Sequence, residues 1–158
     1  GRQFEDRDFI DKLKNVLNET GLNPEMLELE ITESVLTNVK STIEILKEIR
    51  KLGVLISVDD FGTGYSSLSY IKDLPIDAIK VDQSFVKDIH KNKESKEIAR
   101  ALINLANSIG IKAIAEGIEQ KEHVEQLRKD GYKLGQGFYY SRPLKSDAFE
   151  QYVKNKQN

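Results

Sequence analysis

Two adjacent carboxylates end an apolar run near the middle of the chain. Residues 53–58 are apolar apart from Ser57, and Asp59 and Asp60 follow them directly. Like charges in contact are unfavourable and favour protonation unless a cation lies among them. Hard divalent cations prefer oxygen ligands, and two such ions held close together suit the displacement of a phosphoryl group. The pair therefore predicts a site for two adjacent metal ions, if the chain turns at this point so that both carboxylates reach it.

The elements that must position these carboxylates alternate between strand and helix. Short apolar runs indicate strands at 27–32, 54–59, 77–82, 111–116 and 133–137. Apolar residues at helical spacing indicate helices at 6–20, 39–51, 94–109, 120–130 and 146–155, with a short one at 66–72. Ser95 is the expected N-cap of the third long helix, and Gly110 its expected C-terminal stop. This alternation favours βα units around a parallel sheet.

Each expected strand carries a polar or charged side chain near its C-terminal end: Glu30, Asp59, Lys80, Glu116 and Gln136. Because side chains alternate along a strand, this set lies on the face opposite the one that helices cover. A (β/α)8 barrel builds its active site at these strand ends, and an open doubly wound sheet also uses them. One polar strand end needs no function, since a loop follows it. Five in one register favour a shared site in which Lys80 offsets part of the negative charge.

Composition excludes several classes of protein. A net charge of −2 gives no electrostatic reason to expect polymeric nucleic acid or an anionic membrane as a partner. The chain has no cysteine, which excludes disulfides and thiolate metal sites, and it has no apolar run of about 18 residues. Asp60-Phe61-Gly62 matches the metal-binding triplet of protein kinases, but the other kinase motifs are missing. His90 and His123 lack the spacing of metal ligands and are expected at the surface.

Five motifs stand in order along nearly the whole chain. They are LELEITES at 27–34, DDFGTGYSSL at 59–68, IKVD at 79–82, AEGIE at 115–119, and QGF at 136–138 with RPL at 142–144. Together they resemble the EAL domain, a family of bacterial cyclic di-GMP phosphodiesterases. The resemblance implies a TIM-like (β/α)8 barrel that hydrolyses cyclic di-GMP to linear pGpG, with two Mg2+ or Mn2+ ions in an intact site.

The resemblance also implies roles for single residues. Glu30, Asp59 and Asp60 would be metal ligands, and Glu116 would act at the metal centre as a ligand or general base. Lys80 would hold the attacking water or a phosphate oxygen.

Other matched residues would build the surroundings of this centre. Glu119 and Gln136 would complete the substrate pocket, with Asp82 in support. Glu33 would anchor the loop from Gly62 to Ser67, which implies a homodimer formed through this loop region.

The chain departs from the family pattern at its start. The Glu-Ala-Leu motif is absent, and so is the Asn of the strand expected just before Gly1; both the Glu and the Asn are metal ligands in the family. We therefore expect residues 1–158 to be the C-terminal part of a single EAL-type domain, an incomplete barrel that lacks about three of the eight strands. A natural remnant is the alternative to a piece of a full domain.

Two functions follow from this expectation. The intact parent would be a cytoplasmic, metal-dependent phosphodiesterase, which other domains could anchor to a membrane, and residues 1–158 alone would have little activity. The alternative is a catalytically inactive cyclic di-GMP receptor or a dimerisation module. Clustered acids favour the enzyme, because a scaffold has no need of them.

Overall fold

The computed structural model describes residues 8–33, 35, 39–64 and 71–156. The short helix expected at 66–72 lies mostly outside these residues, and only the 3-10 turn η4 (Ile71–Asp73) is seen there. Among the described helices, none is both long and apolar enough to cross a lipid bilayer.

Five parallel strands form one sheet in chain order: β1 (Glu28–Thr32), β2 (Leu55–Phe61), β3 (Ala78–Val81), β4 (Lys112–Ala115) and β5 (Leu134–Gly135). The α-helices are α1 (Phe9–Thr20), α2 (Val39–Lys51), α3 (Gln83–Val86), α4 (Lys93–Ile109), α5 (Lys121–Lys129) and α6 (Ser146–Lys156), and η2 (Pro24–Met26) is a second 3-10 turn. The predicted alternation of strands and helices is confirmed.

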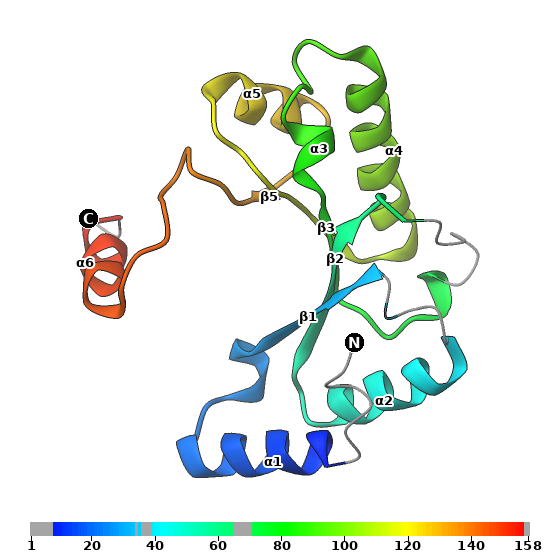
Figure 1. Ribbon diagram of the computed structural model, residues 1–158, viewed down its shortest axis with the longest axis vertical. Coiled ribbons are helices and arrows are strands. Elements are labelled where there is room, and N and C mark those ends of the chain that lie inside the picture. The colour runs from blue at the N-terminus through cyan, green and yellow to red at the C-terminus, as the bar shows by residue number, and fades with distance from the viewer. Residues whose placement is uncertain (1–7, 34, 36–38, 65–70, 157–158) are drawn as a thin grey trace.

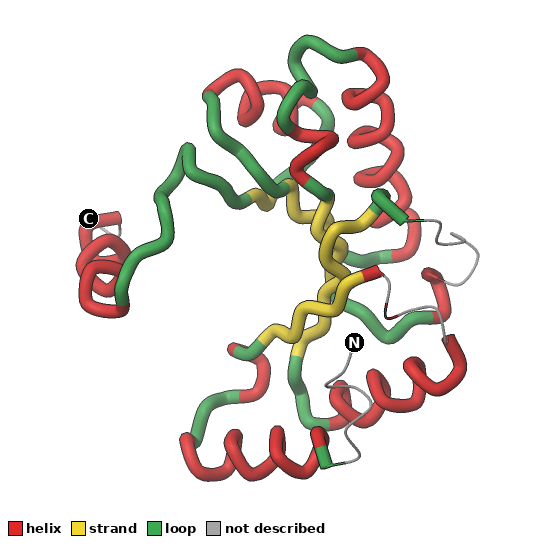
Figure 2. The backbone as a smooth tube through the Cα atoms, viewed as in Figure 1, coloured by secondary structure: helices red, strands yellow, loops and turns green. Residues whose placement is uncertain are grey.

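The sheet is curved, with helices covering its outer face. Helices α2 and α4 lie on one side of the sheet, and α6 stands apart on the other side at the end of an extended segment (Figures 1 and 2). The outer face carries Ile56, Val58, Ile79 and Val81, all with no measurable exposure. Burial of this apolar face is the main stabilising contribution to the sheet, at about 25 cal/mol per Å2. The polar side chains are left on the inner face.

Helix α4 begins earlier than its sequence suggests. Asn92 is its N-cap, and the Asn92 side-chain oxygen accepts hydrogen bonds from the backbone N–H groups of Glu94 and Ser95. The expected Ser95 cap was therefore wrong, because an earlier residue with a short polar side chain already satisfies these donors. Gly110 closes the helix in the left-handed conformation, with φ 77°, as predicted.

The expectation of a surface position was also wrong for His123. This side chain is 1% exposed and lies on the face of α5 that also buries Val124 and Leu127. Its ring packs against that of His90, with 5.2 Å between the ring centroids. A histidine next to Val124 and four residues before Leu127 shares the apolar stripe of the helix, and this was the signal in the sequence.

The edges of the sheet generate a prediction. In the part of the chain that the structure describes, β1 and β5 each pair with a strand on one side only. Unpaired N–H and C=O groups at a sheet edge invite pairing with another chain, and Leu134 beside the β5 edge is 44% exposed. We expect residues 1–158, prepared alone, to form assemblies larger than a dimer in multi-angle light scattering, whereas the complete domain, whose closed barrel has no free strand edge, should not exceed a dimer. A cooperatively folding monomer of residues 1–158 would contradict this prediction.

Candidate functional site

Carboxylates from the ends of several strands lie around one buried lysine, Lys80. Lys80 Nζ lies 2.8 Å from Glu30 Oε1, 3.1 Å from Asp59 Oδ1 and 2.8 Å from Glu116 Oε1. Gln136 Nε2 donates a hydrogen bond to the same Glu116 oxygen. These residues come from β1, β2, β3 and the segments after β4 and β5. The predicted convergence of the five strand-end side chains is confirmed.

Lys80 is held in its charged form. Its side chain is 5% exposed, and burial disfavours the charge. Hydrogen bonds to Glu116, Glu30 and Asp59 more than offset this burial, so the pKa of the Lys80 amine lies above its ordinary value. Lys80 therefore remains an ammonium group at neutral pH.

The neighbouring carboxyl groups carry more negative charge than Lys80 balances. Burial raises the pKa of Glu116; Lys80 opposes this rise, while the charges of Asp59 and Glu30 add to it. Burial also raises the pKa of Asp60, and Asp59 and Asp82 raise it further against the opposing effect of Lys80. Both carboxyl groups therefore ionise less readily than usual. An additional cation between them would stabilise their charged forms.

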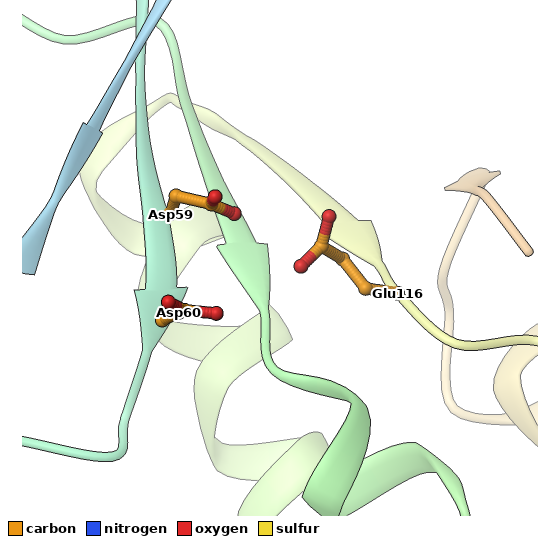
Figure 3. A group of neighbouring side chains, drawn as sticks. All are labelled: Asp59, Asp60 and Glu116. Atoms are coloured by element: carbon orange, nitrogen blue, oxygen red, sulfur yellow. The ribbon is translucent and has the colours of Figure 1, made fainter.

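A local irregularity brings the two adjacent aspartates to one place. The register between β2 and β3 shifts between Val58 and Phe61, and Asp60 has the left-handed φ of 54°. This bulge lets neighbouring side chains leave the strict alternation of a strand. One carboxylate oxygen each of Asp59, Asp60 and Glu116 lies within 4.8 Å of the others, and Figure 3 shows the three groups facing a common space. The turn required for a shared site is therefore present.

The donor set of this cluster suits a hard divalent cation. All three groups offer carboxylate oxygen, the ligand type that Mg2+, Mn2+ and Ca2+ prefer. Asp59 Oδ1 is buried, and Lys80 Nζ lies 3.1 Å from it. One ammonium group uses only part of the acceptor capacity of a carboxylate, so Asp59 can also accept a metal bond.

A cavity of about 520 Å3 opens beside the carboxylate cluster. The expected site residues that line it are Asp60, Asp82, Glu116, Glu119 and Gln136. Its other walls contain Phe138, Arg142, Phe149 and Tyr152. The Arg142 guanidinium lies 4.8 Å from the centre of the Phe138 ring. The cavity thus pairs an acidic side with an aromatic and cationic side.

Phe149 and Tyr152 were missed by the sequence analysis. They come from α6, which was expected as a helix at 146–155 with no site residue named in it. Their three-residue spacing puts both rings on one face of α6, and that spacing is the signal that could have found them. The Tyr152 hydroxyl donates to the Tyr140 carbonyl oxygen at 3.2 Å, which ties the helix to the segment that follows β5.

Glu33 and Asp82 organise backbone around the site. Glu33 is 7% exposed, and its Oε2 accepts hydrogen bonds from the N–H groups of Gly62 and Gly64, each at 3.2 Å. Asp82 Oδ1 accepts from Ser84 N and caps α3. Glu33 therefore holds the start of the loop from Gly62 to Ser67. The rest of that loop, on which the expected dimer contact falls, lies outside the described residues.

The family model described as the EAL domain matches residues 1–143. The chain belongs to the EAL domain family. The cyclic di-GMP phosphodiesterase NbdA of Pseudomonas aeruginosa is 44% identical over 146 residues, which cover 92% of this chain and 19% of NbdA. The signaling protein YkoW of Bacillus subtilis is 41% identical over 153 residues, 96% of this chain and again 19% of the relative. The chain thus spans about a fifth of the length of these curated EAL relatives.

Solved EAL structures share the fold. The PaMucR phosphodiesterase, in complex with c-di-GMP, superposes with a TM-score of 0.89 at 34% identity and covers 93% of this chain and 60% of that one. The BlrP1 protein of Klebsiella pneumoniae, in a manganese and cyclic di-GMP complex, gives a TM-score of 0.83 at 35% identity, with 89% and 36% covered. The predicted fold class, an incomplete TIM-like barrel of α/β type with five strands, is confirmed.

A substitution of Asp60 tests whether this carboxylate binds a metal ion and lowers folding stability when no metal is bound. Asp60→Asn removes a charge that faces Asp59 and Asp82, and asparagine tolerates the left-handed φ. In the complete domain without metal, we expect the free energy of unfolding in urea to rise by about 0.5 kcal/mol, the size of an exposed charge interaction. We also expect Mn2+ affinity in calorimetric titration to fall roughly tenfold or more, because a carboxylate ligand is lost.

Asp73→Asn is the matched control, since Asp73 is an exposed aspartate in η4 outside the cluster. It should change neither quantity measurably. Unchanged Mn2+ affinity in Asp60→Asn would show that Asp60 is not part of a metal site.

Proposed function

We propose that residues 1–158 belong to a metal-dependent phosphodiesterase that hydrolyses cyclic di-GMP to linear pGpG. The observation that carries the proposal is the buried Lys80 ammonium between Glu30, Asp59 and Glu116, the last of which also lines a cavity of about 520 Å3. Relatives and neighbours in the family are named as cyclic di-GMP phosphodiesterases or as complexes with this molecule. A scaffold would gain nothing from such a concentration of carboxylates.

The proposal treats residues 1–158 as the C-terminal part of a single EAL domain. The chain covers 60% of the PaMucR chain and 68% of the EAL domain of Mycobacterium smegmatis DcpA. Strands β1 and β5 are the edges of the described sheet, and a barrel needs further strands between such edges. The rest of the domain would supply these strands together with additional ligands for the metal centre.

Two divalent cations, Mg2+ or Mn2+, would be held by Glu30, Asp59, Asp60 and Glu116. The close spacing of the Asp59, Asp60 and Glu116 oxygens supports this assignment. So do the raised pKa values of Asp60 and Glu116, which show that negative charge is disfavoured here without a further cation. Manganese is present in the BlrP1 complex. Such ions would supply Lewis acidity toward the phosphoryl oxygens and favour ionisation of water.

The residues of the chain have distinct proposed roles in the reaction. Lys80, which stays charged, would donate hydrogen bonds to the attacking water or to a phosphate oxygen as negative charge develops there. Glu116, whose pKa is raised by burial, would accept a proton from that water as a general base. Gln136 orients Glu116 through the hydrogen bond between their side chains.

Cyclic di-GMP would occupy the cavity next to this cluster. Asp82, Glu119 and Gln136 would contact its polar groups from the strand-end side. The stacked pair of Phe138 and Arg142 offers a flat aromatic face and a guanidinium, which suit a purine base and its acceptor edge. The cavity therefore matches a molecule with both phosphate and guanine groups.

The proposal also includes a homodimer formed through the region from Gly62 to Ser67 and a cytoplasmic location. The anchoring of Gly62 and Gly64 by Glu33 supports the first, because it ties the start of that loop to the residue that follows β1. The absence of cysteine suits a reducing compartment. The alternative function is a cyclic di-GMP receptor without turnover.

A turnover assay separates the enzyme from the receptor. The complete domain, supplied with Mn2+ or Mg2+, should convert cyclic di-GMP to pGpG in a chromatographic assay. Lys80→Ala should reduce kcat by on the order of 100-fold, because it removes a charged donor to the reacting oxygens. Circular dichroism should show that the variant keeps its secondary structure.

Lys112→Ala is the control for this test, because Lys112 is exposed at the start of β4, at the opposite end of the strands. It should keep the wild-type rate. Tight binding of cyclic di-GMP with no pGpG formed would favour the receptor, and near-normal hydrolysis by Lys80→Ala would show that its proposed role is wrong.

A further inference from the structure

His123 is a buried histidine that the proposed reaction does not use. It lies on α5, is 1% exposed, and faces the segment 116–119 that follows β4. Its Nδ1 accepts a hydrogen bond from the backbone N–H of Glu119, at 3.4 Å. An imidazole that accepts at Nδ1 carries its proton on Nε2 when neutral. This contact therefore requires a neutral His123 whose proton is on Nε2.

The segment held by His123 is packed closely on its other sides. Gly117 has a φ of 68°, and a Cβ added there would lie 2.5 Å from Gln83 Cβ. Ile118 N donates to the Gln136 carbonyl oxygen, and Tyr139 N donates to the Ile118 carbonyl oxygen. A Cβ at Gly137 would lie 2.1 Å from the Ile118 carbonyl oxygen. The segment is thus fixed by α3 and by the chain after β5, and His123 fixes its end at Glu119.

The surroundings of His123 favour the neutral imidazole. Burial lowers the pKa of His123, and the neighbouring His90 lowers it further; the Lys87 backbone and the charges of Glu119 and Glu122 oppose this. His123 Nε2 is buried without a well-aligned partner among the described residues. Protonation would also turn Nδ1 from an acceptor into a donor facing another donor. A charged His123 would therefore lose the bond from Glu119.

We propose that His123 is a positioning residue: its neutral imidazole holds the backbone of Glu119 at the end of the segment 116–119, and proton binding releases Glu119 from this contact. The inference rests on the proposed function, because Glu116 and Glu119 are assigned to the reaction and the pocket there. Because Glu119 lines the cavity together with Glu116, a shift of the Glu119 backbone at low pH weakens catalysis in addition to any protonation of the site carboxylates. His123 acts only through this backbone.

An NMR titration tests the contact without relying on activity. In the complete domain, the 15N chemical shift of the Glu119 amide should follow the protonation of the His123 ring, with a midpoint below the ordinary histidine pKa of about 6.5. In His123→Gln, which offers an oxygen acceptor that does not titrate, the Glu119 amide should lose this transition. A Glu119 amide that is indifferent to the ionisation of His123 would overturn the proposal.

The pH profile of kcat for cyclic di-GMP is the second readout. His123→Leu removes the acceptor while keeping an apolar side chain, and kcat should fall about fivefold to tenfold, the rate equivalent of one hydrogen bond. His123→Gln should recover most of this loss and keep its activity to lower pH than the wild type. His90→Gln removes a neighbour that lowers the pKa of His123. This variant should therefore shift the acid limb of the kcat profile to higher pH, the direction opposite to that expected for His123→Gln.

The outcomes separate this inference from the proposed function. If no variant and no wild-type domain hydrolyses cyclic di-GMP, the proposed function fails while the NMR titration still decides the role of His123. If His123→Leu is unfolded, His123→Gln carries the test alone. A His123→Gln profile identical to that of the wild type would overturn the inference.

Discussion

The site depends on one buried ammonium group that holds carboxylates from three other parts of the chain. Lys80 lies within 3.1 Å of oxygens from Glu30, Asp59 and Glu116. A buried charge is stable only if paired partners offset its desolvation, and removing a partner leaves that charge uncompensated. Because the partners lie on β1, on β2 and directly after β4, the parallel register of the sheet is a condition for this cluster as well as for the core. The same contacts keep Lys80 charged and therefore able to serve as a hydrogen-bond donor.

Near this lysine, the backbone adopts a conformation that brings site residues together at a cost in folding stability. Asp60 has a left-handed φ although it is not glycine, and it faces two other aspartates. Such strained residues persist only where the surrounding structure determines them, and they concentrate at functional sites. The bulge that places Asp60 also interrupts the pairing of β2 with β3, which resumes with Phe61 opposite Val81. Stability lost here is offset by the apolar outer face of the sheet, where Ile56, Val58 and Ile79 are fully buried.

Much of this arrangement could be predicted from the residues. Apolar alternation located all five strands to within about two residues of the observed bounds. It also predicted that Glu30 and Lys80 face inward, because side chains alternate between the two faces of a strand and one face must carry the apolar residues. The detailed bulge at Asp60, the N-cap at Asn92 and the burial of His123 depend on competition between neighbouring donors and on tertiary packing. Phe149 reaches the cavity only because the segment after β5 returns α6 to it, and no local pattern specifies such a path.

Anomalous X-ray diffraction from crystals of the complete domain grown with Mn2+ tests the central claim most directly. Two adjacent manganese peaks should lie against the carboxylates of Asp59 and Asp60, with Lys80 Nζ still within hydrogen-bond distance of Glu116. Manganese absent from this cluster, or bound elsewhere while Asp59 and Asp60 contact only protein groups, would contradict the claim that these strand ends form a metal-dependent catalytic centre.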